Sequence, residues 1–340
     1  MFPALLDKLQ LRQDLTVVEA EAAMAAIMDG AATPAQTAGL LTALRAKGER
    51  PAEIVGLARS MRARALPLRR GHPEAFDTCG TGGDGTGTFN VSSVVALVVA
   101  ACGVAVAKHG NRSVSSRSGS ADVFESLGVD VAAPPAVVER CLDEVGIAFF
   151  FAPTFHPSMR HAAQTRKELG IRTAFNLLGP LTNPAGAARQ LVGVPRPELT
   201  EVVARSLAML GSERAWVVHG ADGIDEISTT GYTKVSECRG DYVRTFFLHP
   251  SDFGLAKASL GELAGGDPAT NACLTRELLD GARGARRDIV VFNAAAALLI
   301  VGLVSSIRDG LARASAVLDS GAARATLARL VRVSRGEGTP

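Results

Sequence analysis

Residues 77–93 read DTCGTGGDGTGTFNVSS, a stretch with five glycines that lies between a short apolar run and a long one. Glycine lets backbone N–H groups approach an anion in conformations that a side chain would forbid. Asn90, Ser92 or Ser93 can cap the helix expected over residues 94–102, and the N-terminus of a helix attracts anions. The stretch therefore predicts a phosphate-binding loop, for which a flexible surface loop is the alternative.

A second loop of similar composition follows the next apolar run. Residues 104–107 are apolar, and residues 108–120 read KHGNRSVSSRSGS, which combines cations, hydroxyl groups and glycine. Ligands of an open α/β sheet bind outside the carboxyl ends of its strands. We therefore expect the two loops to face each other across one polyanionic ligand.

The order of the expected elements indicates the fold class. Residues 1 to about 65 have helical patterns only, with capping boxes at Thr16 and Thr33 and a third helix that begins at Pro51. Strands and helices then alternate, which is typical of a parallel sheet with helices on both faces. The expected strands are residues 75–78, 104–107, 147–151, 215–219 and 242–248. We predict an α/β protein with a small N-terminal all-helical domain, residues 1–70, and a large α/β domain, residues 71–340, whose mainly parallel central sheet is flanked by helices.

The composition argues against several classes of protein. The formal net charge of +2 gives no reason to expect a nucleic-acid or membrane-surface partner. The five cysteines are scattered without a CxxC pair, which indicates neither a zinc site nor a disulfide framework. We see no signal peptide, and the apolar run 289–304 is too short for a comfortable membrane span, so we expect a buried core helix and a cytoplasmic protein.

Five motifs, in order along nearly the whole chain, resemble those of the anthranilate phosphoribosyltransferase family. They are GTGGDG (80–85), NVSS (90–93), KHGNRSVSS (108–116), RKELGIRTAFNLLGPLTNP (166–184) and DGIDE (222–226). The family implies transfer of the phosphoribosyl group of 5-phosphoribosyl 1-diphosphate (PRPP) to the amine of anthranilate, with release of diphosphate, in tryptophan biosynthesis. It also implies Mg²⁺ as cofactor, a homodimer, and a small domain joined by helices within residues 156–176, with the substrate cleft between the domains.

The resemblance also assigns the site residues. It implies no covalent catalytic residue, because positioning and electrostatics drive the reaction. The residues matched to PRPP are Gly80, Gly83, Asp84, Thr88, Asn90, Val91, Ser92, Ser93, Lys108, His109, Gly110, Asn111, Arg112, Ser113, Val114, Ser115, Ser116 and Ser120. Those matched to anthranilate are Gly80, Asn111 and Arg166, of which Arg166 would pair with the substrate carboxylate. Those matched to the metal are Ser92, Asp225 and Glu226, which offer the oxygen ligands that Mg²⁺ prefers.

The sequence departs from the family in places, and other readings stay open. Ser93 stands where threonine is commoner, and Gln164 and Thr165 stand where the family has proline and valine. The acidic pair could instead complement a helix N-terminus. A pyrimidine nucleoside phosphorylase-like enzyme would share the architecture but favours a longer chain. A non-catalytic, nucleic-acid-binding relative should have lost the loop glycines or the acidic pair and gained a basic face.

Overall fold

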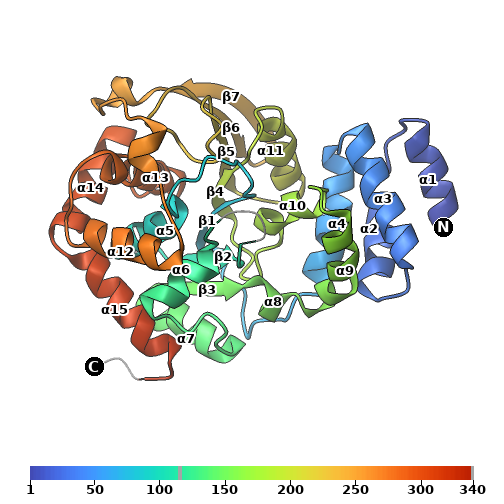
Figure 1. Ribbon diagram of the computed structural model, residues 1–340, viewed down its shortest axis with the longest axis horizontal. Coiled ribbons are helices and arrows are strands. Elements are labelled where there is room, and N and C mark those ends of the chain that lie inside the picture. The colour runs from blue at the N-terminus through green and yellow to red at the C-terminus, as the bar shows by residue number, and fades with distance from the viewer. Residues whose placement is uncertain (114–116, 338–340) are drawn as a thin grey trace.

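A seven-stranded sheet forms the centre of the larger part of the molecule (Figure 1). The computed structural model describes residues 1–113 and 117–337. The strands are β1 (Phe76–Gly80), β2 (Val106–Gly110), β3 (Ile147–Phe151), β4 (Arg189–Gly193), β5 (Arg214–Gly220), β6 (Thr233–Arg239) and β7 (Tyr242–Leu248). Their order in the sheet is β3-β2-β1-β4-β5-β6-β7. The strands from β3 to β5 are parallel, and β6 runs antiparallel to both of its neighbours, β5 and β7. The predicted mainly parallel sheet is therefore confirmed.

Alternate residues of the central strands pack into two separate apolar cores. In β4, Leu191 belongs to one core and Val192 to the other. In β5, Trp216 belongs to the first core and Val217 to the second. Because successive side chains of a strand point to opposite faces, both faces of the sheet are buried, as a parallel sheet requires.

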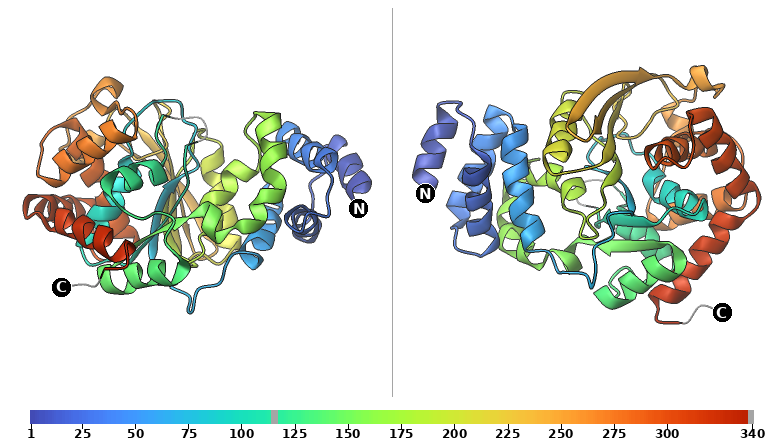
Figure 2. Two further views of the ribbon diagram at one scale, coloured as in Figure 1. Left: turned by 60° about the horizontal axis from the view of Figure 1, so that its bottom comes forward. Right: turned by 180° about the vertical axis from the view of Figure 1, so that it is seen from behind.

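Helices cover the two faces of the sheet, as Figure 2 shows from two directions. The first core is completed by α5 (Val91–Ala101), α6 (Ser120–Leu127), α7 (Pro135–Val145), α8 (Ala152–Phe155), α12 (Pro268–Leu279), α13 (Ala285–Ile300), α14 (Ile307–Asp319) and α15 (Ala322–Ser334). The second core is completed by α9 (Arg160–Leu169), α10 (Phe175–Leu178), α11 (Leu199–Met209) and the N-terminal helices. The apolar run 289–304 lies largely in α13, which is the buried helix that the sequence predicts. No helix in the described ranges is long and apolar enough to cross a membrane.

The N-terminal helices form a separate group at one end of the molecule (Figure 1). They are α1 (Phe2–Gln10), α2 (Val17–Met28), α3 (Pro34–Lys47) and α4 (Pro51–Ala63). The predicted capping boxes at Thr16 and Thr33 are confirmed, because each hydroxyl accepts from the backbone N–H three residues later. Helix α9 packs against α2 and α3 although it is far from them in sequence. The division of the chain at residue 70 stays a prediction.

Two glycines inside N-terminal helices make a matched test of this packing. A Cβ at Gly56 of α4 would overlap the carbonyl oxygen of Val17 and lie 2.8 Å from the Cβ of Ala20 in α2. A Cβ at Gly39 of α3 would lie 3.4 Å from the end of the flexible Leu6 side chain. We predict that Gly56→Ala destabilises the protein by about 1–3 kcal/mol through overpacking. Gly39→Ala should instead be neutral or stabilise by up to about 1 kcal/mol through helix propensity.

The measurement is urea unfolding of both variants beside the parent protein. Equal effects of the two substitutions would show that α2 and α4 do not approach as closely as the structure indicates.

Candidate active site

Four parallel strands end in glycine at the same edge of the sheet. Their last residues are Gly80 of β1, Gly110 of β2, Gly193 of β4 and Gly220 of β5. The carboxyl ends of neighbouring parallel strands meet at one edge, so the loops that follow these strands converge there. This is the arrangement that the sequence predicts for the two phosphate loops.

Asp225 fills the space that side chains at two of these glycines would occupy. A Cβ at Gly80 would overlap Oδ2 of Asp225, and a Cβ at Gly193 would overlap its carbonyl oxygen. The backbone N–H of Gly82 donates to Oδ2 of Asp225 at 3.2 Å. Burial raises the pKa of Asp225 to about 7, and the negative charge of Asp84 adds to the rise. The close approach therefore holds a carboxylate directly beside the glycine-rich loop.

Glu226 lies beside the first turn of α5. Its Oε1 accepts a hydrogen bond from the backbone N–H of Ser92 at 3.1 Å, and the residue is 8% exposed. Burial, followed by the charge of Asp225, raises the pKa of Glu226 well above its ordinary value. The cations near the pair, Lys108 and Arg172, offset only part of these rises. Full ionisation of both buried carboxylates therefore calls for a further cation beside them.

The donor atoms fit a hard divalent cation better than a transition metal. Carboxylate and hydroxyl oxygens are typical ligands of Mg²⁺, which keeps several waters and binds substrate phosphates. Within residues 1–113 and 117–337, no group of three or more His, Cys, Asp and Glu side chains could hold a metal ion. Asp225, Glu226 and Ser92 carry oxygen donors of the kind that such an ion prefers.

Asp222, the first residue of the DGIDE motif, has a different task. Its Oδ1 accepts from the backbone N–H of Ile224 at 3.3 Å, and its Oδ2 accepts from the hydroxyls of Ser228, at 3.0 Å, and Thr230. Asp222 thus stabilises the turn that presents the two carboxylates.

Asn293 of α13 holds the chain immediately after the carboxylate pair. Its Oδ1 accepts from the backbone N–H of Ile227 at 2.9 Å, and its Nδ2 donates to the carbonyl of Ile227 at 2.8 Å. The side chain is completely buried. The sequence shows it only as a polar residue within an apolar run, and no local pattern reveals its partner.

The structure brings the residues matched to PRPP to this edge of the sheet. They are Gly80, Gly83, Asp84 and Thr88 at the end of β1 and in its loop, Asn90, Val91, Ser92 and Ser93 at the start of α5, Lys108, His109 and Gly110 in β2, and Asn111, Arg112, Ser113 and Ser120 after it. Val114, Ser115 and Ser116 lie outside the described residues. Val91 and Ser93 are each only 1% exposed. These two residues therefore pack into the protein below the loop.

Lys108 and Asp77 form a buried polar layer below the second loop. Lys108 is 2% exposed, and its Nζ donates to the carbonyl of His109 at 3.3 Å. Oδ1 of Asp77 accepts from the backbone N–H of His109 at 3.2 Å. Burial raises the pKa of Asp77, and the charge of Lys108 opposes the rise. These contacts fix the backbone from which the second loop departs.

Arg112 points toward α6. Its Nη1 lies 3.0 Å from Oδ1 of Asp122 and 2.7 Å from Oε2 of Glu125. Asp122 also accepts from the backbone N–H groups of Ser113 and Gly119 at 3.0 and 2.9 Å. In this structure Arg112 therefore closes the second loop onto the helix that follows it.

Two neutral imidazoles lie close together beside the second loop. The ring centroids of His109 and His156 are 5.3 Å apart, and Nδ1 of His109 lies 3.0 Å from the carbonyl of Gly179. Burial lowers the pKa of His109 to about 3 and that of His156 to about 4. Nε2 of each ring is buried and lacks a hydrogen-bond partner in the described part of the chain. The sequence did not indicate His156, because no motif surrounds it.

Arg166 is a cation stacked on an aromatic ring. Its Cζ lies 4.9 Å from the centroid of the Phe175 ring. Burial lowers the pKa of Arg166, and within the described residues no carboxylate offsets that effect. A planar guanidinium held in this way is suited to a bidentate bond with a ligand carboxylate.

Arg172 is a second arginine at the site, which the sequence did not single out. Its Nη2 donates to the carbonyl of Thr81 at 3.0 Å, within the glycine-rich loop. A cavity of about 130 Å³ beside it is lined by Gly83 and Arg172 and also by Arg45 and Glu49 of the N-terminal helices and the loop between them. This cavity thus lies between the phosphate loop and the N-terminal helices.

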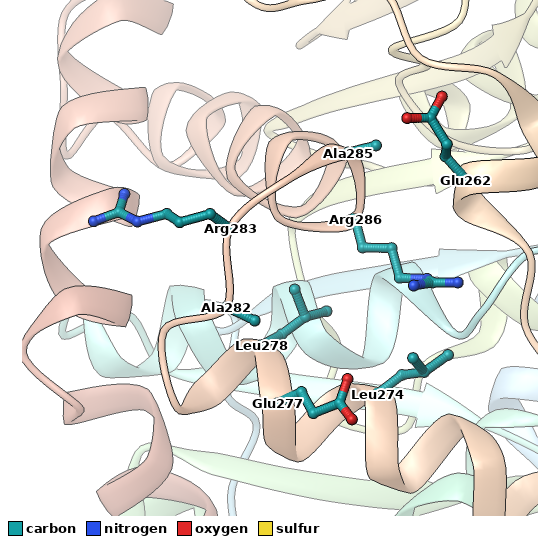
Figure 3. Close-up of a pocket in the computed structure, with 8 residues that line it drawn as sticks. All are labelled: Glu262, Leu274, Glu277, Leu278, Ala282, Arg283, Ala285 and Arg286. Atoms are coloured by element: carbon teal, nitrogen blue, oxygen red, sulfur yellow. The ribbon is translucent and has the colours of Figure 1, made fainter.

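A larger cavity of about 300 Å³ lies elsewhere, between α12 and α13 (Figure 3). It is lined by Glu262, Leu274, Glu277, Leu278, Ala282, Arg283, Ala285 and Arg286. None of the residues matched to substrate or metal lines it. Its size alone therefore does not make it the active site.

Comparison with known proteins first defines the class. Residues 72–324 match the family described as "Glycosyl transferase family, a/b domain", and residues 3–65 match "Glycosyl transferase family, helical bundle domain". The chain therefore carries both domains of this glycosyl transferase family, with the helical bundle first.

Individual relatives narrow the class to one family. The anthranilate phosphoribosyltransferase of Moorella thermoacetica is 57% identical over 97% of this chain and 98% of its own length. The crystal structure of the enzyme from Thermus thermophilus has a TM-score of 0.92 and 47% identity, covering 97% of this chain and 99% of that chain. The Saccharomyces cerevisiae enzyme in complex with PRPP and Mg has a TM-score of 0.90 and 28% identity, covering 98% of each chain. The chain belongs to the anthranilate phosphoribosyltransferase family.

Neighbouring glycines of the first loop provide a test of the site geometry. Gly82 and Gly83 have φ angles of 64° and 73°, so a side chain strains the backbone at both. A Cβ at Gly83 would also overlap Nη1 of Arg172, whereas a Cβ at Gly82 would meet nothing within 4 Å. We predict that Gly83→Ala weakens PRPP binding at least about tenfold more than Gly82→Ala, a difference of about 1.4 kcal/mol.

Calorimetric titration with PRPP and Mg²⁺ measures the difference, and the melting temperatures of the two variants serve as the control for folding. Similar affinities of both variants would mean that Arg172 does not shape the loop.

Proposed function

We propose that the protein transfers the phosphoribosyl group of PRPP to the amine of anthranilate and releases diphosphate. The observation that carries this proposal is the buried pair Asp225 and Glu226 beside a glycine-rich loop, a site that suits a metal-bound diphosphate. The partly buried Arg166, stacked on Phe175, adds a place for the carboxylate of the acceptor. The relatives that share the fold and half or more of the sequence carry the same name.

The donor would lie along the loops after β1 and β2. Its diphosphate would meet the backbone N–H groups of the glycine-rich loop and the N-terminal turn of α5. We propose that the phosphoribosyl donor is bound by the residues that the sequence matched to PRPP, which lie between Gly80 and Ser120. Val91, Ser93 and Arg112 would act through the packing and the ion pairs described above.

Ser92, Asp225 and Glu226 would hold Mg²⁺, which supplies positive charge to the diphosphate as it leaves. Cleavage of the bond between ribose and diphosphate develops positive charge on the ribose and negative charge on the leaving group. The reaction needs no covalent bond to the protein, so the residues act by positioning and by electrostatic stabilisation.

Anthranilate would lie beside Gly80 and Asn111, with its carboxylate on Arg166. His109 and His156 stay neutral at physiological pH, because burial lowers the pKa of both. Neutral imidazoles offer hydrogen bonds to an amine without repelling a positively charged ribose. We assign them to substrate orientation and no acid–base step.

The remaining assignments concern the whole protein. We propose that residues 1–70, with α9, form a small domain that meets the α/β domain across the substrate cleft. A cytoplasmic location agrees with the free thiols of all five cysteines. We further propose that the protein is a homodimer, as the resemblance to the family implies. Sedimentation equilibrium at the mass of a single chain would contradict the dimer.

The metal assignment predicts the behaviour of Asp225→Asn combined with Glu226→Gln. These substitutions keep the shape and remove both charges, so turnover should fall roughly 10²–10³-fold and no longer respond to Mg²⁺. The assay is the PRPP-dependent loss of anthranilate fluorescence over a range of Mg²⁺ concentrations. Asp241→Asn, at an exposed position in the turn between β6 and β7, also removes a carboxylate charge and is the control that should leave turnover and the Mg²⁺ response unchanged.

Two outcomes of that assay would count against the proposal. If the parent protein shows no PRPP-dependent loss of anthranilate fluorescence, the proposed function is wrong. If the double variant keeps the parent's Mg²⁺ response, the metal assignment is wrong and the proposed function still stands.

The acceptor assignment predicts that Arg166→Ala lowers catalytic efficiency roughly 10- to 150-fold, because a charge-assisted pair contributes about 1.5–3 kcal/mol. The loss should appear in the KM for anthranilate, while the KM for PRPP stays within about twofold. Arg166→Lys should restore little, since an ammonium group lacks the planar fork. Lys167→Ala, at an exposed position on the same helix, is the control. A loss confined to PRPP would assign Arg166 to the donor.

A further inference from the structure

A segment from the C-terminal part of the chain lies alongside the glycine-rich loop. The backbone N–H of Gly265 donates to the carbonyl of Gly87 at 2.9 Å, and that of Phe89 donates to the carbonyl of Leu263 at 3.1 Å. Between them, Thr88 and Ala264 form an antiparallel bridge. The second half of the loop, Gly87–Phe89, is therefore shaped by residues 263–265.

Asn271 of α12 fastens this segment to the start of α5. Its Oδ1 accepts from the backbone N–H of Gly266 at 2.7 Å, and its Nδ2 donates to Oδ1 of Asn90 at 2.8 Å. The residue is 2% exposed. A Cβ at Gly265 would lie 2.6 Å from Cα of Phe89 and 2.8 Å from Oδ1 of Asn271, so the contact leaves no room for a side chain there.

Asn90 extends the link to the second phosphate loop. Its Oδ1 also accepts from the hydroxyl of Ser118 at 3.1 Å, and its Nδ2 donates to the carbonyl of Ser118 at 3.2 Å. The hydrogen bonds Asn271–Asn90–Ser118 thus connect α12, the N-cap of α5 and the loop after β2. These partners fix the orientation of the Asn90 amide. A flip would bring its oxygen against the carbonyl of Ser118 and its Nδ2 against Nδ2 of Asn271.

We propose that Asn271 is a positioning residue for the phosphoribosyl donor, which acts through Asn90 and Ser118 to set the two phosphate loops relative to each other. The proposal rests on the donor site described under Proposed function. The described residues of the two loops form no helix or strand that would fix their positions. Helix α12, by contrast, is held in place by its packing against α6 and α15. Loss of the Asn271 amide should therefore weaken the binding of the donor's diphosphate and leave the acceptor site unchanged.

The alternative is a purely structural role, in which Asn271 only stabilises the turn before α12. Asp267 has that role on the same helix, because its side chain caps the helix by accepting from the backbone N–H of Thr270 at 2.8 Å. Asp267 lies outside the link to Asn90. Asp267→Ala is therefore a matched control that weakens the start of α12 and leaves the hydrogen bonds of Asn271 and Asn90 in place; the Asp267 charge also acts on Arg117 of the second loop.

Asn271→Asp is the sharpest variant, because it changes one atom. The carboxylate still accepts from Gly266 but repels Oδ1 of Asn90. At pH 8 we expect the KM for PRPP to rise at least about tenfold, with the KM for anthranilate within about twofold of the parent. The calorimetric Kd for PRPP with Mg²⁺ should rise by a similar factor. Asn271→Ser, whose hydroxyl is too short to reach Asn90, should give the same split and serves if the Asp variant does not fold.

The control decides between the two roles. Asp267→Ala should lower the melting temperature and leave the KM for PRPP within about twofold. If the Asn271 variants lower the melting temperature as Asp267→Ala does, and their KM and Kd for PRPP also stay within twofold, the positioning role is overturned. Equal rises in KM for both substrates would overturn it as well. Failure of the underlying function is distinguishable, since the parent protein itself would then show no PRPP-dependent turnover.

Discussion

Asp225 is packed against two strand ends that carry no side chain, and the rest of the site depends on this contact. Gly80 and Gly193 leave the space in which the end of the turn after β5 can reach the glycine-rich loop. Once Asp225 is placed there, Glu226 reaches the backbone N–H of Ser92 and ties the same turn to α5. One close approach thus joins the residues that would hold the metal to the loop that would hold the donor.

The same packing has an electrostatic cost. Asp225 and Glu226 are buried with raised pKa values, Arg166 is desolvated, and His109 and His156 are held neutral. A buried carboxylate or guanidinium charge destabilises a folded protein unless a partner neutralises it. In this protein the partners would be the substrates and a cation. The arrangement is typical of functional sites, where stability is given up for a preorganised electrostatic environment.

Much of the fold is predictable because its signals are local. Strand β3 covers the residues expected of it, and α2 and α3 begin at the expected capping boxes. Strands β4 and β6 were not predicted. Strand β6 reads TKVSECR, in which only Val235 and Cys238 are apolar, so it lacks the pattern of a buried strand. Ser236 and Glu237 are accommodated by partners elsewhere in the sheet and in α11. The phosphate loops and the acidic pair could be read from motifs. Asn293, Arg172 and His156 could not, because a single buried polar residue has no sequence pattern until its distant partner is known.

The central claim is that Asp225 carries a buried charge that the protein's own groups stabilise only in part and that bound metal and donor stabilise further. It is tested by the free energy of unfolding of the parent protein and of Asp225→Asn, measured in urea at pH 8, above the pKa of about 7 for Asp225. Without ligands, the Asn variant should be more stable than the parent by about 1–3 kcal/mol, because it removes a buried charge. With saturating Mg²⁺ and PRPP the order should reverse, since ligand binding stabilises the parent more. The same order of stability in both conditions would contradict the account.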